Sequence, residues 1–173
     1  MPEGTMDAFV RTVHRWLLAL SCVGMLAAFV SVSLGILARL LRWDMAGLDA
    51  YAGYAIAASL FLALPATLLR GEHIRVTLVL ERLPGWGRAA LEWWCLLAGT
   101  ALSCYLSWYA ARLVWVSRVT HDVSPGADVT PLWIPQTAMA VGCAGLALAF
   151  LQVVLHRWRG TDLLAPGAAA RTE

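Results

Sequence analysis

The chain has 173 residues, of which 60% are hydrophobic and 14% are charged, and its mean hydropathy is +0.68. A soluble domain of this length cannot bury so much apolar surface, so the composition indicates a membrane protein. The 13 basic residues are all Arg, and together with 11 acidic residues they leave a formal charge of +2. Such a balanced charge argues against a protein that binds nucleic acid.

Four stretches without Asp, Glu, Lys or Arg divide the chain, and each is close to or above the roughly 20 residues that cross a bilayer. We therefore expect an all-α membrane domain over residues 13–159, after a cytoplasmic lead at 1–12. Its four transmembrane helices are expected at about 16–38, 50–69, 93–111 and 132–155. The first stretch is longer than a signal-peptide core of about 7–15 residues, so it is expected to remain as a span. Residues 160–173, rich in Ala and Gly, are expected to form a flexible cytoplasmic tail.

The positions of Arg predict the orientation in the membrane. Nine Arg lie in the N-terminal lead, the connection between the second and third spans, and the C-terminal tail, whereas the opposite side has four. Because positive residues accumulate on the cytoplasmic side, both termini are predicted to be cytoplasmic. The nine Trp lie near both ends of the spans, as expected of aromatic belts at the two membrane surfaces.

The connection between the second and third spans has an amphipathic pattern. As a helix it would place four apolar residues on one face, namely Val76, Val79, Leu80 and Leu83. Its charged residues lie away from that face, and Pro84-Gly85 would stop the helix. This segment is therefore expected to lie in the plane of the cytoplasmic interface, or to extend a span into the cytoplasm.

Small residues recur along the fourth span at spacings of 4, 3 and 4. They are Ala138, Gly142, Gly145 and Ala149. Such a stripe lets helix backbones approach closely, so it predicts a packing face. The pattern leaves open whether the facing helix belongs to this chain or to another.

The predicted spans lack charged residues at their centres, and this absence argues against several classes of membrane protein. No Asp, Glu, Lys, Arg or His falls near the middle of a span, where a charge would cost about 2.5–3.5 kcal/mol. A self-sufficient ion-coupled transporter would need a titratable carboxylate at that depth, and a haem-bearing anchor would need two facing His. Three His lie at the cytoplasmic edge and one near the opposite edge, namely His14, His73, His156 and His121. We therefore expect a non-enzymatic scaffolding subunit with neither catalytic nor substrate-binding residues.

The four Cys, at positions 22, 95, 104 and 143, lie within the predicted spans and form no CxxC pair. Thiols buried in a membrane usually serve as small apolar side chains. Neither a disulfide nor a metal site is expected from them.

Residues 70–77, Arg-Gly-Glu-His-Ile-Arg-Val-Thr, are followed by Leu83-Pro84. This run resembles the signature of the small membrane subunit of TRAP transporters, the DctQ-like family. Pro131-x-Trp133-x-Pro135 before the fourth span and an acidic residue after Trp43 fit the same family. One departure is Thr77, which stands where the family usually has Asp and puts a strict role of that position in doubt.

The resemblance implies a subunit of a bacterial or archaeal inner-membrane uptake system. It would scaffold a large membrane subunit that holds the sites for an organic anion and for the coupling Na⁺. A periplasmic binding protein would deliver the anion. The chain itself would hold no cofactor and bind no nucleic acid. A membrane-anchor subunit of a redox complex is the alternative.

The resemblance and the membrane topology together give two candidate contact sets, each facing a partner subunit or lipid. On the cytoplasmic side they are Arg70, Gly71, His73 and Arg75. On the periplasmic side they are Arg39, Arg42, Trp43, Asp44, Trp133 and Pro135.

Overall fold

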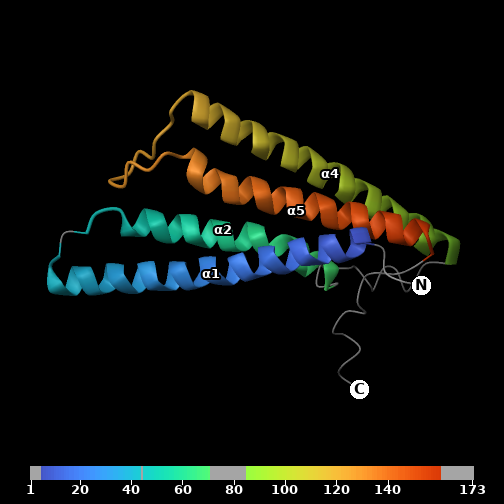
Figure 1. The fold of residues 1–173 in the computed structure, drawn as a ribbon, viewed down its shortest axis with the longest axis horizontal. Helices are drawn as coiled ribbons and strands as arrows, with labels where there is room; N and C mark the ends of the chain where they lie inside the picture. The colour runs from blue at the N-terminus through green and yellow to red at the C-terminus, as the bar shows by residue number, and fades with distance from the viewer. Residues whose placement is uncertain (1–4, 44, 71–84, 161–173) are drawn as a thin grey trace, which may run out of the picture.

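The computed structural model describes residues 5–43, 45–70 and 85–160, and these residues form four helices (Figure 1). The helices are α1 (Thr5–Leu41), α2 (Leu48–Leu69), α4 (Gly85–Val119) and α5 (Trp133–Trp158). All four are long and apolar enough to cross a membrane, and the described residues contain no strand beyond one isolated bridge. The predicted all-helical membrane fold with four spans is confirmed. The predicted interfacial segment and the tail lie outside the described residues.

Two helices are much longer than the uncharged stretches that predicted them. α1 has 37 residues and α4 has 35, which makes each more than 50 Å long at about 1.5 Å per residue. The hydrocarbon core of a bilayer is only about 30 Å thick. The ends of these helices therefore continue into the interfaces, where charged residues are tolerated and the backbone hydrogen bonds still favour the helix.

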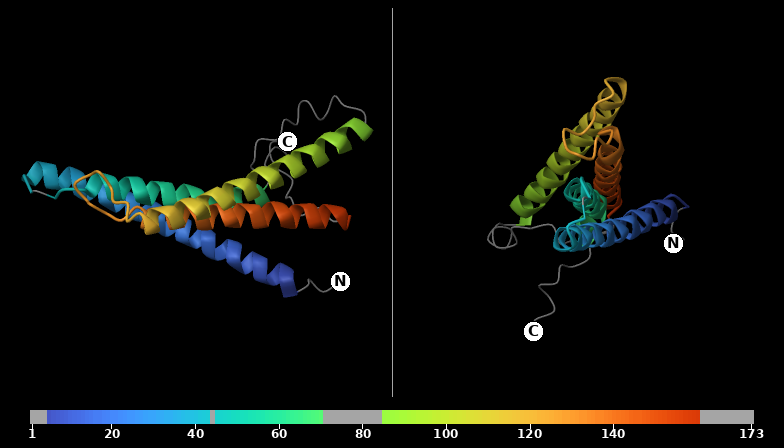
Figure 2. Two further views of the ribbon diagram at one scale, coloured as in Figure 1. Left: turned by 90° about the horizontal axis from the view of Figure 1, so that it is seen from above. Right: turned by 90° about the vertical axis from the view of Figure 1, so that its left-hand side faces the viewer.

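The helices pack in the order α1, α2, α5, α4 rather than as a closed bundle. α2 lies between α1 and α5, and α4 packs along the other side of α5. In the described part of the chain, α4 has no substantial contact with α1 or α2. Figure 2 shows α1 and α4 diverging toward the end at which α1 begins and α5 ends. The arrangement leaves broad apolar surfaces of α1 and α4 uncovered.

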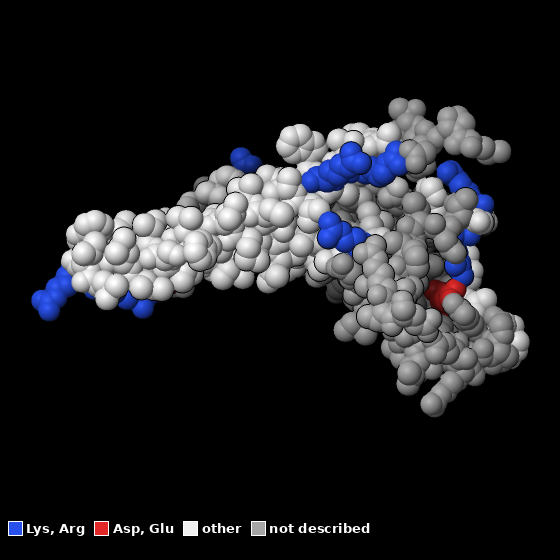
Figure 3. All heavy atoms as spheres, turned by 90° about the horizontal axis from the view of Figure 1, so that it is seen from below, with Lys and Arg blue, Asp and Glu red and all other residues white. Residues whose placement is uncertain are grey.

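The two ends of the molecule differ. We call the end with the α1–α2 and α4–α5 connections the loop end, and the end at which α1 begins and α5 ends the terminal end (Figure 1). Figure 3 shows Arg side chains gathered toward the terminal end, a smaller group at the loop end, and a largely uncharged surface between them. This distribution suits a molecule that spans a bilayer along its long axis.

One side of α1 forms a continuous seam of covered, mostly small residues. They are His14, Leu17, Ser21, Gly24, Ala28, Ser31, Gly35 and Ala38. Their alternating spacings of three and four residues give a repeat of 3.5, which keeps one side of a helix against its neighbour in a left-handed crossing. The Ser21 hydroxyl donates a 2.8 Å hydrogen bond to the Ser59 carbonyl. A Cβ placed on Gly24 would lie 3.2 Å from the Ser59 Cβ. The small residues therefore bring the backbones of α1 and α2 close together.

Candidate functional site

The packing stripe on α5 faces other helices of the same chain. A Cβ placed on Gly142 would lie 2.4 Å from the carbonyl oxygen of Phe61 on α2. One placed on Gly145 would lie 2.6 Å from Leu17 Cδ1 of α1 and 2.9 Å from Pro65 Cγ of α2. Ala149 is fully buried in the core cluster with Leu68 and Leu146, and Ala138 is half-buried. The structure thus places most of this stripe at the crossing of three helices.

A second small-residue seam, on α4, was not singled out from the sequence. Ser103, Ala110 and Ser117 are spaced by seven residues and are 2–4% exposed. A Cβ on Gly99 would lie 2.6 Å from Cε1 of Phe150, so this glycine makes room for the Phe150 ring of α5. The seven-residue spacing was the available signal for this seam. Among the described helices it is the only substantial packing surface of α4.

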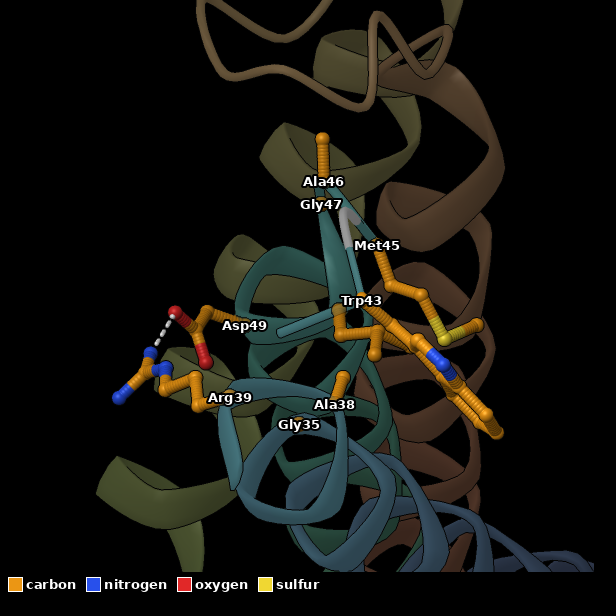
Figure 4. A pocket seen from close by; sticks show the side chains of 9 residues that line it. Gly35, Ala38, Arg39, Trp43, Met45, Ala46, Gly47 and Asp49 are labelled. Atoms are coloured by element: carbon orange, nitrogen blue, oxygen red, sulfur yellow. Dashed lines mark hydrogen bonds and ion pairs between the residues drawn. The ribbon is translucent and has the colours of Figure 1, made fainter. Parts of the chain in front are cut away.

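At the loop end, the end of α1 and the start of α2 enclose an open pocket of about 160 Å³ (Figure 4). Two of the predicted periplasmic residues line it, Arg39 and Trp43. Arg39 Nη2 lies 2.7 Å from Asp49 Oδ2. Arg42 is exposed on the same end of α1 but does not line the pocket, and Asp44 lies outside the described residues.

The remaining predicted periplasmic residues lie on another element. Trp133 and Pro135 are in the first turn of α5. The guanidinium of Arg118, near the end of α4, lies 5.5 Å from the centroid of the Trp133 ring, a cation–π contact. The predicted periplasmic set is therefore split, with one part at the α1–α2 connection and the other at the start of α5.

The strongest polar network of the loop end centres on Asp128, which the sequence analysis did not single out. The Tyr54 hydroxyl of α2 donates to Asp128 Oδ2 at 3.0 Å, and the Ser124 hydroxyl donates to Oδ1 at 2.9 Å. The Thr130 N–H lies 3.4 Å from Oδ2. Gly47, with φ +90°, fits against this residue, since a Cβ there would lie 2.9 Å from the Asp128 Cβ. One carboxylate thus joins the α4–α5 connection to the start of α2.

The hydrogen bonds also set the charge of this carboxylate. Desolvation alone would raise the pKa of Asp128, but the hydrogen bonds from Thr130, Ser124 and Tyr54 outweigh it and lower the pKa to about 2. The group is therefore ionised throughout the physiological range. Its three donors make it a charged brace between the α4–α5 connection and α2.

The α4–α5 connection is itself folded back like a small hairpin. The Ser124 N–H donates to the Thr130 carbonyl at 2.8 Å, and the Leu132 N–H donates to the Asp122 carbonyl at 3.0 Å. Residues 124–128 read Ser-Pro-Gly-Ala-Asp, and this concentration of turn-forming residues was the sequence signal for the hairpin. The connection is a defined surface at the loop end.

At the terminal end, only one residue of the predicted cytoplasmic set can be placed. Arg70 is exposed and caps α2, its N–H donating to the Ala66 carbonyl at 3.1 Å. Gly71, His73 and Arg75 lie outside the described residues. An ion pair not anticipated from the sequence joins Glu92 of α4 to Arg157 of α5 at this end.

The described His and Cys residues are spread over the molecule. His14 is buried in the α1 seam, His121 is exposed at the loop end, and His156 is in the last turn of α5. Cys143 is buried, and the other three Cys are exposed on the helices. Within residues 5–43, 45–70 and 85–160, no group of three or more His, Cys, Asp and Glu is arranged to hold a metal ion.

Comparison with known proteins identifies a family. The family model for the DctQ component of tripartite ATP-independent periplasmic transporters matches residues 28–160. The match runs from within α1 to just past the end of α5 and includes the whole loop end. No curated protein and no solved structure matches the chain.

Proposed function

The chain belongs to the DctQ family of tripartite ATP-independent periplasmic (TRAP) transporters, and we propose that it is the scaffolding small membrane subunit of such a transporter. Members of this family work with a large membrane subunit and a periplasmic binding protein. The family match over residues 28–160 carries the proposal. It favours a transporter component over the alternative, a membrane anchor of a redox complex.

The proposal includes the transport chemistry. The transporter takes up an organic anion together with Na⁺ across the inner membrane, and both sites belong to the large subunit. This division of labour is supported by the helices themselves, because residues 16–38, 50–69, 93–111 and 132–155 carry no Asp, Glu, Lys or Arg. Charged residues inside a membrane commonly mark the pathways of substrates and ions, and these spans carry none. The small subunit supplies packing surface instead.

We place the contact with the large subunit on the uncovered face of α4. This face carries aromatic side chains with polar tips, namely Tyr105, Trp108, Tyr109 and Trp115, which are 45–71% exposed. Tyr105 lies seven residues, or about 10 Å of helix rise, inside Arg112. A hydroxyl at that depth gains from a protein partner more than from lipid. Tyr, Trp and Arg are also the residues that dominate contact energies in protein interfaces.

The contact residues predicted at the two interfaces complete the proposal. Arg70, Gly71, His73 and Arg75 would face the large subunit or lipid headgroups on the cytoplasmic side. The hairpin of the α4–α5 connection, held by Asp128, would present the loop end to the large subunit or to the loaded binding protein.

Mild-detergent purification of the tagged chain from its native membrane, with mass spectrometry of the retained proteins, tests this function. We expect a large polytopic membrane protein in equal amount. Trp108→Ala should weaken its retention by about fivefold, which corresponds to the roughly 1 kcal/mol of a single hot-spot side chain. A chain that purifies alone, or with a soluble redox enzyme, would contradict the proposed function.

Phe29→Ala on α1 is the matched control. Phe29 and Trp108 are both 71% exposed, and each lies on an uncovered helix face. Retention of the large subunit should be unchanged in Phe29→Ala. Loss in this variant but not in Trp108→Ala would move the contact to α1 and leave the subunit function standing.

A further inference from the structure

The loop-end pocket combines an apolar floor with a charged rim. Gly35, Ala38 and Leu48 are among its apolar lining residues, and the Trp43 and Met45 side chains point to the side opposite the Arg39–Asp49 pair (Figure 4). Trp43 is 60% exposed and Met45 is 48% exposed. The rim carries the Arg39–Asp49 pair. An amphipathic ligand would meet both kinds of surface at once.

The position of the pocket in the membrane determines which molecules can reach it. It lies where one membrane-spanning helix ends and the next begins, which is the level of lipid headgroups and of interfacial Trp. Lipid phosphate, glycerol and the first acyl carbons are the most concentrated groups there.

The charges of the rim select among headgroups. Arg39 and Asp49 are 74% and 81% exposed in their side chains. One hydrogen bond joins them, whereas a guanidinium has five donors and a carboxylate about four acceptor positions. Both groups therefore keep bonding capacity toward a ligand. Among the described lining residues, one positive and one negative group form the rim, and such a pair complements a zwitterion better than an anion, which Asp49 would repel.

We propose that this pocket binds the headgroup of phosphatidylethanolamine. Arg39 donates hydrogen bonds to the lipid phosphate, and Asp49 accepts hydrogen bonds from the primary ammonium. Trp43 and Met45 lie along the glycerol and the first acyl carbons. A choline headgroup has no N–H to donate and is bulkier, so it fits the carboxylate and the small pocket less well. This inference goes beyond the transporter assignment and does not depend on it.

Native mass spectrometry of the purified full-length chain tests the proposal. The chain is mixed in detergent with phosphatidylethanolamine, phosphatidylcholine or phosphatidylglycerol, each alone at equal concentration. Phosphatidylethanolamine should be retained most. Arg39→Gln and Asp49→Asn should each lower its retention by about three- to fivefold, the size expected of exposed charge pairs. Asp49→Asn should also raise the retention of phosphatidylglycerol, because it leaves the rim positive.

Two further variants sharpen the test. Arg42→Gln removes the same charge from the same end of α1 without touching the pocket lining, and it should retain phosphatidylethanolamine as the wild type does. Gly35→Met should block the pocket. A Cβ at Gly35 would meet Asp49 Oδ1 only at 3.8 Å, so the backbone need not move.

Equal retention of the three lipids by the wild type would overturn the proposal. So would unchanged retention in Arg39→Gln and Asp49→Asn, or an equal loss in Arg42→Gln, which would indicate general attraction to the basic end of α1. Circular dichroism and elution volume, measured on every variant, separate loss of binding from loss of fold. None of these outcomes bears on whether the chain assembles with a large subunit.

Discussion

At the scale of single residues, Asp128 links parts of the chain that are far apart in sequence. Its carboxylate accepts hydrogen bonds from Tyr54, 74 positions earlier in the chain, and from Ser124 in its own connection. Hydrogen bonds to a charged acceptor are stronger than neutral ones. They compensate for bending the connection so tightly that Val129, a β-branched residue, adopts φ 44°. We infer that this brace decides how firmly the hairpin sits on α2.

Replacing Asp128 with Asn keeps the size of the side chain and removes its charge. We expect the hairpin to loosen, because an amide oxygen accepts these hydrogen bonds less strongly than a carboxylate. Amide hydrogen exchange over residues 120–132 should become faster, while exchange within α5 stays unchanged. Asp122→Asn is the control, since the side chain of Asp122 accepts only a 3.3 Å contact from Ser117. Similar loosening in both variants would mean that net charge, and not the brace, holds the hairpin.

The same carboxylate predicts a pH dependence of the hairpin. Its pKa is about 2 in the folded chain, below the ordinary value near 3.9 for Asp. A lowered pKa stabilises the fold above the ordinary pKa, and the contribution is lost as the pH falls toward the folded value. Exchange protection of the hairpin should therefore be constant from pH 7 to about 4 and decline between about 4 and 2. Asp128→Asn should show no such decline specific to the hairpin.

At the scale of helices, two glycines show the difference between a closely packed helix face and an exposed one. Gly142 of α5 faces the backbone of α2 at Phe61, which a side chain cannot push aside cheaply. Gly53 of α2 is exposed, and a Cβ there would meet no described atom within 4 Å. The two positions look alike in sequence, because each lies in a stripe of small residues. Their surroundings differ completely.

A single added methyl group tests this difference. Gly→Ala favours a helix by about 1 kcal/mol at either position. At Gly142 this gain should be exceeded by overpacking, which costs about 1–3 kcal/mol, so Gly142→Ala should lower the thermal midpoint of the chain in detergent. Gly53→Ala should leave the midpoint unchanged or raise it. A stable Gly142→Ala variant would contradict the close approach of α5 to α2.

The helices also show which structural features can be predicted from sequence patterns and which cannot. The four uncharged stretches predicted all four spans, because burying charge in lipid is expensive wherever the helix packs. The seams on α1 and α4 were missed, although the residues of the α1 seam repeat every three or four positions and those of the α4 seam every seven. α1 carries Ala, Ser and Gly on several of its faces, so composition alone does not show which face meets a neighbour. The packing face of such a helix can be identified only once the neighbouring helix is known.

At the scale of the whole molecule, the chain is a row of helices rather than a bundle. α5 and α2 are the inner helices, and α1 and α4 are the outer ones (Figure 2). Most residues of these two helices are uncovered. In an apolar 18-residue stretch of each helix, only 17% of the residues of α1 and 6% of those of α4 are buried. Lipid tolerates such surfaces in a single chain, and a partner subunit can cover one of them without rearranging the row.

The orientation of this row is a prediction that a reporter can test. Nine of the 13 Arg lie before the first span, between the second and third spans, or after the fourth span in the sequence, so this side of the membrane should be the cytoplasmic one. A reporter that is active only in the cytoplasm, fused after Arg159, should be active. One that is active only in the periplasm, inserted between Gly126 and Ala127, should be active as well. The opposite pattern would show that the Arg distribution does not determine the topology.

By itself, the sequence determined the membrane class, the number and approximate positions of the spans, and the family resemblance that the family match supports. These properties depend on local composition and spacing, since each span must satisfy the bilayer alone. Contacts in the folded chain were needed to establish the order α1, α2, α5, α4, the inward packing of Gly142 and Gly145, and the brace at Asp128. They depend on which backbones approach each other, and that is set by contacts between residues far apart in the chain. Tyr54 and Asp128 look ordinary in their own segments and become a pair only when α2 and the α4–α5 connection meet.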